Sequence, residues 1–450
     1  MKRVAIIGGG FAGLSAGVEL AARGLQVTVL EGRPRLGGRA YSFTDDATGE
    51  VVDNGQHAMM GCYTHTLRFL ERIGATPKLH RQNTLRVEML HRRFGAGAIA
   101  CAALPSPLHM LSGILGYRLL RRYERWAALR AGLRLMLMHR RHDPRLAAGT
   151  VEEVLMRLGQ SAEARASFWY PVAVATLNES PARAAAAPFA EVLARAFFGT
   201  RADSQFVLPK VGLSDLYTDD ARRFIEARGG SVRTRASAAT LVLQQERVEA
   251  IELRDGSRVE ADACIAAVPP KALGALLPES ALVQRSLAAL AQLECSPIVS
   301  THLWFDRPVL RSEFVGLVGT KTQWLFNRSR LTAQASADGS QCVSAVISAG
   351  RDVVEWDNAR VAATVVADLR ALIPAARAAR LLRSVVVKEK YATIAPTPAA
   401  ERCRPGAETA LDNCFLAGDW INTGLPPTIE SAVVSGQHAA ALVAARLARH

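Results

Sequence analysis

The first 31 residues combine a strand pattern and a helix pattern of hydrophobic positions. Residues 4–7 are a short apolar stretch rich in β-branched side chains, which predicts a buried parallel strand. Residues 11–23 have the spacing of an amphipathic helix, and residues 27–30 are again apolar and β-branched. This order predicts a strand–helix–strand unit, so the chain should open an α/β fold with a parallel sheet.

Three glycines fall in the loop between the first strand and the helix. Gly8 permits a tight turn, Gly10 lets the backbone approach a pyrophosphate, and Gly13 lets the helix pack closely on the strand. The helix begins at Phe11 and Ala12, and its N-terminal amides and positive dipole end would point at the phosphates. The loop therefore predicts a dinucleotide-binding site.

The residues after the second strand indicate which dinucleotide binds. Glu31 stands 18 residues after Gly13, at the place where an acid would hold the ribose hydroxyls of an adenosine. A second glycine pair, Gly37 and Gly38, follows and is flanked by arginines, with Arg39 directly after it. A nicotinamide dehydrogenase has no obvious need for this element, whereas a larger cofactor with a second phosphate contact does.

The Gly-Gly doublet with its trailing arginine resembles the superfamily of FAD-dependent amine oxidases and phytoene desaturases. Residues 415–420, Phe-Leu-Ala-Gly-Asp-Trp, match the same superfamily near the other end of the chain. The resemblance implies that Asp419 meets the ribityl–phosphate part of FAD and that a helix from about Thr428 aims its N-terminus at the flavin ring. A positive helix end there would stabilise the anionic reduced flavin. The family has a valine near position 238 that touches the adenine, where this chain has Ala238.

The candidate FAD-binding residues follow from these motifs and from the resemblance. They are Gly8, Gly10, Phe11, Ala12, Gly13, Glu31, Gly32, Arg33, Gly37, Gly38, Arg39, Gly55, Gln56, Ala238, Gly418, Asp419, Thr428 and Ile429. The predicted fold is α/β and Rossmann-like, of the amine oxidase and phytoene desaturase type, with a discontinuous substrate domain that contains a membrane-associating helical segment.

The order of elements predicts the domain boundaries. A helix over residues 216–228, a strand from 232, a hairpin around 246–256 and a strand over 261–268 repeat the α/β pattern in mid-chain. Residues 1–85, 206–290 and 401–450 are expected to form the FAD domain, and residues 86–205 and 291–400 the substrate domain. The stretch up to about residue 200 reads as mostly helical, including the alanine-rich residues 182–190.

Cysteine usage and the N-terminus bear on location and on metals. The seven cysteines are scattered, with no C-x-x-C pair and no histidine cluster, which argues against a disulfide framework and against a metal site. The chain enters its first strand directly, so no signal peptide fits. We expect a protein of the reducing cytoplasm.

The net charge of +14 is concentrated in one segment. Residues 86–141 hold 11 arginines and only two acids, Glu88 and Glu124. A solvated basic face is one interpretation. Nucleic-acid binding is another, but no nucleic-acid fold is visible and aromatic residues are only 6% of the chain, so we expect no nucleic-acid partner. The third interpretation is a membrane surface.

The apolar pattern of this segment favours the membrane. Residues 95–117 lack charged side chains, but Pro105, Pro107 and His109 break the stretch before it could span a bilayer. Residues 117–141 read as one amphipathic helix with arginines crowding one flank, which describes a helix lying in a bilayer interface. The apolar positions are Leu119, Tyr123, Trp126, Leu129, Leu133, Met136 and Leu137, and the flanking arginines are Arg118, Arg121, Arg122 and Arg125. Core packing of an ordinary helix is the competing interpretation.

Further motifs narrow the resemblance to hydroxysqualene dehydroxylases of bacterial hopanoid pathways. They are residues 53–57 (Asp-Asn-Gly-Gln-His), 61–66, 417–420 and 423–432. This resemblance implies an FAD enzyme that removes the hydroxyl of hydroxysqualene with a hydride and gives squalene. The substrate is a water-insoluble C30 isoprenoid, so a basic, apolar surface at the inner face of the cell membrane suits it.

The chemistry requires an acid, because hydroxide is a poor leaving group. Asp53, His57 and Glu430 are the candidate catalytic residues. The structural alternatives are a turn cap for Asp53, a cofactor hydrogen bond for His57, and a flavin-orienting or helix-N-terminal role for Glu430 near the start of the last helix. The aromatic cluster of residues 168–170 could shield a cation or belong to the core.

Two other flavin chemistries share these motifs. A carotenoid-type desaturase or isomerase would abstract hydride from a polyene. An amine oxidase would need an aromatic cage beside the flavin, and residues 420–423, Trp-Ile-Asn-Thr, replace the aromatic pair usual near the last helix. No second nucleotide fingerprint for NAD(P)H is visible, so the electron donor for FAD stays open between a transient donor and a partner reductase.

Overall fold

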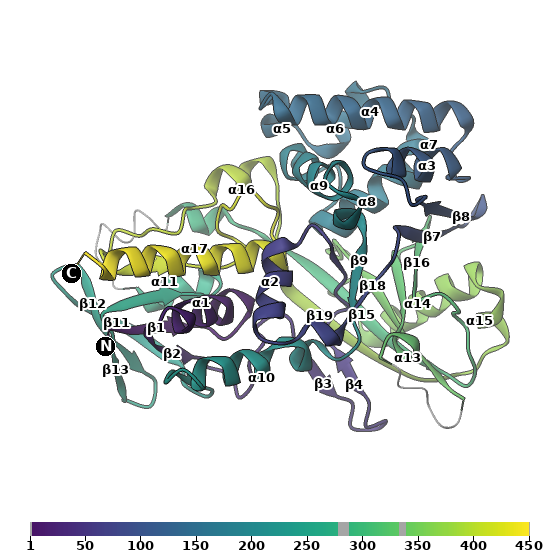
Figure 1. Cartoon of the computed structure of the whole chain (residues 1–450). Helices are drawn as coiled ribbons and strands as arrows, with labels where there is room; N and C mark the ends of the chain where they lie inside the picture. Colours follow the sequence, from purple (N-terminus) through teal and green to yellow (C-terminus); the bar gives the residue numbers. More distant parts are fainter. Residues whose placement is uncertain (1, 278–287, 333–338, 450) are drawn as a thin grey trace.

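The computed structural model describes residues 2–277, 288–332 and 339–449. Figure 1 shows a lobe that carries both chain ends, a second lobe built on a large sheet, and a layer of helices above the second lobe. The predicted domain range 206–290 includes residues 278–287, which lie outside the described residues.

The first lobe is built on a five-stranded parallel sheet. Its order is β10 (Ser231–Arg233), β2 (Gln26–Leu30), β1 (Arg3–Ile7), β14 (Ala263–Ala266) and β20 (Cys414–Leu416). These strands are short and apolar because both faces of the sheet are covered. The chain therefore returns twice to the same sheet, from residues 231–266 and again from 414.

Helices cover one face of this sheet and a smaller sheet covers the other. The covering helices are α1 (Phe11–Ala22), α10 (Leu213–Glu226) and α17 (Ile429–Leu447). The opposite face carries β11 (Ala238–Gln244), β12 (Arg247–Leu253), β13 (Arg258–Glu260) and α11 (Pro270–Leu276). The helices α1 and α17 touch at Gly436, where an added Cβ would lie 2.2 Å from the carbonyl oxygen of Ala12. This close approach fixes α17 against the first loop.

The second lobe is built on a seven-stranded sheet. Its order is β19 (Leu381–Ile394), β15 (Cys295–Phe305), β18 (Gln341–Ile347), β17 (Trp324–Asn327), β16 (Phe314–Val318), β7 (Arg86–His91) and β8 (Gly95–Ala100). The β16–β7 pair is parallel and the others are antiparallel. The helices α14 (Asn358–Leu372) and α15 (Pro374–Ala378) bury apolar residues against one face.

Short strands and helices connect the two lobes. They are β3 (Ser42–Thr44), β4 (Val51–Asp53), β5 (Met59–Met60), α2 (Thr64–Arg72), β6 (Leu79–Arg81), β9 (Phe206–Pro209), α13 (Arg328–Leu331) and α16 (Pro398–Cys403). The helical layer contains α3 (Leu108–Gly116), α4 (Arg122–Arg140), α5 (Pro144–Ala148), α6 (Val151–Arg157), α7 (Ala162–Ala164), a π-helix (Arg165–Trp169), α8 (Tyr170–Leu177) and α9 (Ala186–Phe198). Within the described residues, no helix is long and apolar enough to cross a membrane.

The local predictions hold best where the pattern is strongest. The first strand–helix–strand unit, the hairpin at Asp255–Gly256 and the last helix from Thr428 are confirmed. The helix predicted over residues 216–228 is α10, which begins three residues earlier. The expected break in residues 95–117 is confirmed at Pro105 and Pro107, which lie between β8 and α3, whereas His109 lies within α3 and does not interrupt it.

Two helix boundaries were predicted wrongly. The helix expected over 117–141 begins only at Arg122, because the Glu124 carboxylate accepts from the Arg121 amide at 2.9 Å and starts the helix there. The helix expected over 182–190 begins at Ala186, because the preceding residues form a turn against α6.

Candidate active site

The loop between β1 and α1 leaves an open cradle in front of the helix. Gly8 has φ +112°, and a Cβ there would lie 2.4 Å from the carbonyl oxygen of Ala267. A Cβ on Gly13 would lie 1.9 Å from the carbonyl oxygen of Gly8. Gly10 differs, because the nearest atom to an added Cβ is 3.8 Å away, and it begins α1 with no side-chain cap. The first-turn amides therefore face open space, as an anion site requires.

The second glycine pair lies directly on this cradle. The Gly37 amide donates to the Gly9 carbonyl at 2.9 Å, and a Cβ on Gly38 would lie 3.3 Å from the Cα of Gly10. Arg33 donates to the Gly38 carbonyl at 3.2 Å. Two glycine-rich loops thus meet with only backbone between them.

Glu31 lies buried at the end of β2. Its carboxylate accepts from the Gly9 amide and from the Arg33 amide, both at 2.9 Å. Gly32 packs against the segment before β11, since its added Cβ would lie 3.2 Å from the Ser237 hydroxyl. Ala238, the first residue of β11, is therefore brought to the Glu31 end of the cradle.

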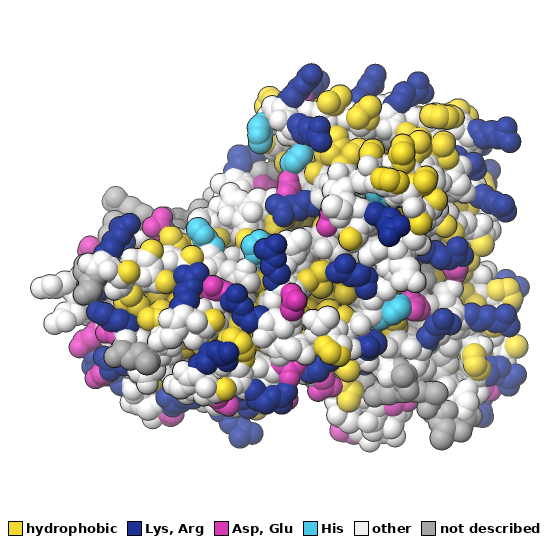
Figure 2. Space-filling model, in the orientation of Figure 1, with side chains coloured by type: hydrophobic (Ala, Val, Ile, Leu, Met, Phe, Trp, Pro, Cys, Tyr) yellow, Lys and Arg dark blue, Asp and Glu magenta, His cyan; other side chains and the backbone are white. Residues whose placement is uncertain are grey.

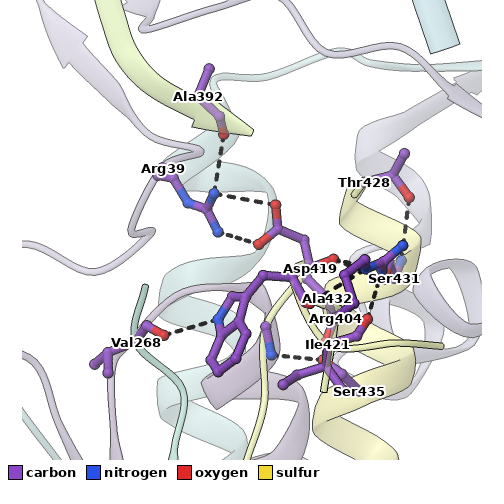
Figure 3. A network of polar contacts seen from close by, with 12 residues as sticks. Arg39, Val268, Ala392, Arg404, Asp419, Ile421, Thr428, Ser431, Ala432 and Ser435 are labelled. Atoms are coloured by element: carbon purple, nitrogen blue, oxygen red, sulfur yellow. Dashed lines mark hydrogen bonds and ion pairs between the residues drawn. The ribbon is translucent and has the colours of Figure 1, made fainter. Parts of the chain in front are cut away.

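Asp419 is the centre of a polar network at the start of the last motif (Figure 3). Both terminal nitrogens of Arg39 contact its carboxylate, and Arg39 also donates to the Ala392 carbonyl at 3.2 Å. Gly418 has φ +150°, and its amide donates to the Ser435 hydroxyl at 2.8 Å. Arg39 thus ties the carboxylate to the second glycine loop, and the Gly418 amide ties the backbone beside it to α17.

Arg404 holds the loop after Asp419. Its buried guanidinium donates to the carbonyls of Asp419, Ile421 and Leu425 at 3.0, 2.6 and 2.8 Å. Sequence reasoning missed Arg404, because it belongs to no motif and, apart from the Glu401 carboxylate, its partners are backbone carbonyls. Thr428 caps α17 by accepting from the Ser431 amide at 3.3 Å, and Ile429 is the first residue of that helix.

This geometry agrees with a known family. A family model described as flavin containing amine oxidoreductase matches residues 11–444. The chain belongs to this family. It is an FAD-dependent oxidoreductase.

Similar proteins cover the whole chain. A hydroxysqualene dehydroxylase from Sinorhizobium fredii is 28% identical over 98% of both chains, and one from Rhodopseudomonas palustris is 29% identical over 99% of both. A 15-cis-phytoene desaturase from Synechococcus elongatus is 23% identical, with 99% of this chain and 96% of that protein covered. The crystal structure of an oxidoreductase from Methanosarcina mazei matches with a TM-score of 0.77 and 16% identity, over 97% of this chain and 99% of that one, which supports the fold.

The cradle fits FAD. The open space at Gly10, the bare first turn of α1 and the backbone of the Gly37–Gly38 loop suit a pyrophosphate. The buried Arg35 Nη1 atom near this path has no hydrogen-bond partner among the residues that the structure describes. A bound ligand with phosphate and flavin polar groups would supply such a partner.

Asp53 is held by several donors at once. Its carboxylate pairs with Arg328 and accepts from the Ser42 hydroxyl at 2.7 Å and from the Leu213 amide at 2.9 Å. Both partners of the ion pair are buried, and His302 Nε2 lies 2.8 Å from the Asp53 carbonyl oxygen. This arrangement gives Asp53 a structural task and leaves its carboxylate little freedom to deliver a proton.

Glu430 is likewise engaged by protein donors. Its carboxylate accepts from the His65 amide at 3.0 Å, the Thr66 amide at 2.8 Å and the Thr66 hydroxyl at 2.6 Å. It therefore caps the N-terminus of α2 and joins that helix to α17. The sequence had left open a role at the N-terminus of the last helix, whereas the Glu430 carboxylate binds the N-terminus of α2.

His57 differs from the two carboxylates. Burial lowers the pKa of its imidazole below the usual value, although the nearby Asp53 and Glu389 carboxylates act in the opposite direction. Glu389, on β19, also accepts from the Asn54 side chain at 3.0 Å. Sequence reasoning missed Glu389 and Arg328, since each comes from an element far along the chain.

An apolar cavity of about 310 Å³ lies under the helical layer. Aliphatic and aromatic side chains of β7, β8, α3, α4, the π-helix, α8 and α9 line it, and Met60 on β5 reaches it from the side of His57. Phe168 and Trp169 are part of the lining, whereas the Tyr170 hydroxyl is bonded to Glu152. Leu108 and Leu133 line the cavity and are also 52% and 56% exposed, so the cavity opens at the α3–α4 surface.

Proposed function

We propose that this enzyme removes the hydroxyl group of hydroxysqualene reductively and releases squalene. The observation that carries the proposal is similarity over nearly the whole chain to two proteins named hydroxysqualene dehydroxylase. The apolar cavity supports it independently, because a C30 isoprenoid needs a long hydrophobic site. An amine substrate would gain little from such a lining.

We propose that FAD lies along the two glycine loops. Gly8, Gly10, Phe11, Ala12 and Gly13 would face the pyrophosphate. Glu31, Gly32, Arg33 and Ala238 would contact the adenosine end, and Gly37, Gly38, Arg39, Gly418 and Asp419 the ribityl–phosphate part. Gly55, Gln56, Thr428 and Ile429 would lie beside the flavin ring. The open cradle and the unpartnered Arg35 atom support this arrangement.

The reaction breaks one C–O bond and forms one C–H bond. Reduced FAD supplies a hydride when it is bound. The hydroxyl group is allylic, so its departure is eased by charge delocalisation, and a proton from the protein lets it leave as water. The apolar lining excludes other water from the carbon that receives the hydride.

Of the three candidate acids, His57 is the one that the geometry favours. Asp53 and Glu430 accept hydrogen bonds from several protein donors, which hold them as acceptors. His57 follows Gly55 and Gln56 and precedes the strand that reaches the cavity, so it lies between the cradle and the lining. We propose that its imidazolium delivers the proton.

We also propose that the α3–α4 surface rests on the cytoplasmic leaflet of the membrane. Trp126, Leu133 and Leu137 share one face of α4 and are 42–56% exposed. Exposed arginines lie among them, and the acid of this helix, Glu124, is buried. Figure 2 shows Lys and Arg side chains interspersed with hydrophobic ones along this edge of the molecule. Such a face suits an anionic lipid interface, and the cavity mouth opens within it.

One experiment separates the proposed reaction from its closest alternative. Enzyme photoreduced in D₂O should convert hydroxysqualene to squalene with a single deuterium, as read by product mass. A product without deuterium would exclude hydride delivery from the cofactor. No turnover of hydroxysqualene, together with anaerobic oxidation of a polyene such as phytoene by the oxidised enzyme, would identify a desaturase instead.

A further inference from the structure

One face of β15 lies along the segment that carries Gly55. Residues 300, 302 and 304 share a face because side chains alternate along a strand. Trp304 packs with Val52, and His302 contacts the Asp53 carbonyl oxygen. Ser300 is next in this row, and its hydroxyl lies 3.4 Å from the position of a Cβ on Gly55.

The same row leads into the apolar cavity. Ser300 pairs with Val346 on β18, and Val346 pairs with Trp324 on β17. Paired residues on neighbouring strands point to the same side of a sheet, and strands lie about 4.8 Å apart. Trp324 lines the cavity, so Ser300 lies about two strands from that lining, at the end next to the proposed flavin site.

Two polar atoms at this end are buried without partners. The Ser300 hydroxyl has no hydrogen-bond partner among the described residues, and its side chain is fully buried. The Gln56 amide oxygen, one residue after Gly55, is likewise buried without a partner among the described residues, on a side chain that is half-buried. Leaving such buried groups unpaired is unfavourable, so a ligand that pairs with them is favoured.

We propose that Ser300 and Gln56 bind the hydroxyl group of the substrate and so select a hydroxylated isoprenoid over a hydrocarbon one. This inference rests on the proposed function. A hydroxyl both donates and accepts a hydrogen bond, so it can donate to the Gln56 amide oxygen and accept from the Ser300 hydroxyl. Squalene has no polar group and would leave both atoms unpaired, which would also favour release of the product.

Binding to the oxidised holoenzyme tests this selection without turnover. The Kd values for hydroxysqualene and for squalene are measured from changes in flavin absorbance, in vesicles of one composition. Wild-type enzyme should prefer hydroxysqualene, and Ser300→Ala should reduce this preference about tenfold, the effect of one neutral hydrogen bond. Ser300→Cys keeps a side chain of similar size with a weaker donor, so its preference for hydroxysqualene should lie between those of the wild type and Ser300→Ala.

Thr301→Val is the matched control. Thr301 is the next residue of β15 on the opposite face, and its hydroxyl is also buried without a partner among the described residues. The variant should keep the wild-type preference. Flavin content, read from the ratio of flavin to protein absorbance, should be unchanged in all variants.

Three results would overturn the inference. One is an unchanged preference in Ser300→Ala and Ser300→Cys, and another is lost flavin content with the preference intact, which would assign Ser300 to FAD. The third is wild-type enzyme that converts hydroxysqualene but binds both lipids equally. That third result would leave the proposed function standing, whereas failure to convert hydroxysqualene at all would remove it.

Discussion

Asp53 belongs to one of the sequence motifs, but its structural role depends on Arg328, 275 positions later in the chain. The ion pair with Arg328 is buried on both sides. Removing one partner of such a pair leaves an uncompensated buried charge, which costs about 3–5 kcal/mol. The motif therefore predicted an important carboxylate, but its role depended on Arg328, which nothing in the local sequence could indicate.

The proton role of His57 predicts a pH dependence. Burial lowers the pKa of His57 below its usual value of 6.5, so the imidazole is neutral at pH 7. The protonated fraction rises as the pH falls through that lowered pKa. Single-turnover conversion of hydroxysqualene by photoreduced enzyme should therefore accelerate between pH 7.5 and 5.5. His57→Asn should be slower by on the order of 10²–10⁴ and should lose this dependence.

His438→Asn is the control for the pH experiment, because His438 lies exposed on α17. It should keep the wild-type rate and profile. If His57→Asn retains full flavin content and the wild-type pH profile, the proton comes from another group.

At the scale of elements, the glycines of the first loop have separable tasks. Gly13 lies where a side chain would collide with backbone, so its replacement should damage the fold itself. Gly10 has no protein atom within 3.8 Å of an added Cβ. We therefore expect Gly10→Val to fold but to lose FAD, because its side chain would occupy the space of the pyrophosphate. The measurements are flavin absorbance and far-UV circular dichroism of the purified variant.

Gly24→Val is the control, because it adds the same side chain at a surface turn. No atom lies within 4 Å of a Cβ added to Gly24. Its φ of +77° disfavours a side chain, so some stability should be lost while FAD is retained. Normal flavin content in Gly10→Val would contradict the proposed place of the pyrophosphate.

The elements that the sequence predicted correctly are those whose pattern lies within one short segment of the chain. The β1–α1–β2 unit and the cap of α17 each lie within about 30 consecutive residues, so turn residues and periodicity suffice. The seven-stranded sheet did not follow from the sequence, because β7 pairs with β16 more than 200 residues later. Long-range pairing of short strands leaves no periodic signal in either segment.

The buried side of helix α4 was predicted only in part. Leu135 is buried in the core, whereas Leu133, two residues earlier, is exposed. Apolar residues occur on both sides of this helix, so periodicity alone could not choose the buried side. The predicted membrane-facing set is wrong at Leu119 and Met136, which are buried in the core. It is also wrong at Arg125, because the Arg125 guanidinium donates to the carbonyls of Leu115 and Leu120 at 2.8 and 2.9 Å. Arg125 holds α3 against α4 instead.

Across the molecule, three features follow one another in space from the surface inward. Exposed arginines of α4 neighbour Leu133 at the cavity mouth, the cavity lies beneath α3 and α4, and Met60, three residues after His57, lines it. With the proposed docking on a bilayer, a lipid would enter this apolar cavity directly. Membrane binding is the part of this arrangement that can be tested without the substrate.

Removing three exposed arginines of α4 should weaken binding to anionic vesicles. Each basic residue near an anionic surface contributes about 1 kcal/mol, so Arg122, Arg130 and Arg134 replaced by Gln should lower the partition coefficient about a hundredfold. Arg125 is left intact because of its backbone contacts. Binding of the parent protein should also weaken with salt, since exposed charges are screened over roughly 8–10 Å at physiological ionic strength. Vesicle co-sedimentation measures both effects.

The matched control removes the same charge elsewhere. Arg254, Arg311 and Arg402 are exposed residues outside the helical layer, and their replacement by Gln also lowers the net charge by three. If only total charge matters, this variant and the α4 variant will bind equally weakly. If the α4 face is the docking surface, the control will bind close to the parent while the α4 variant releases the vesicles with its flavin absorbance unchanged. Equal binding of the α4 variant and the parent would instead contradict the proposal that the α3–α4 surface rests on the membrane.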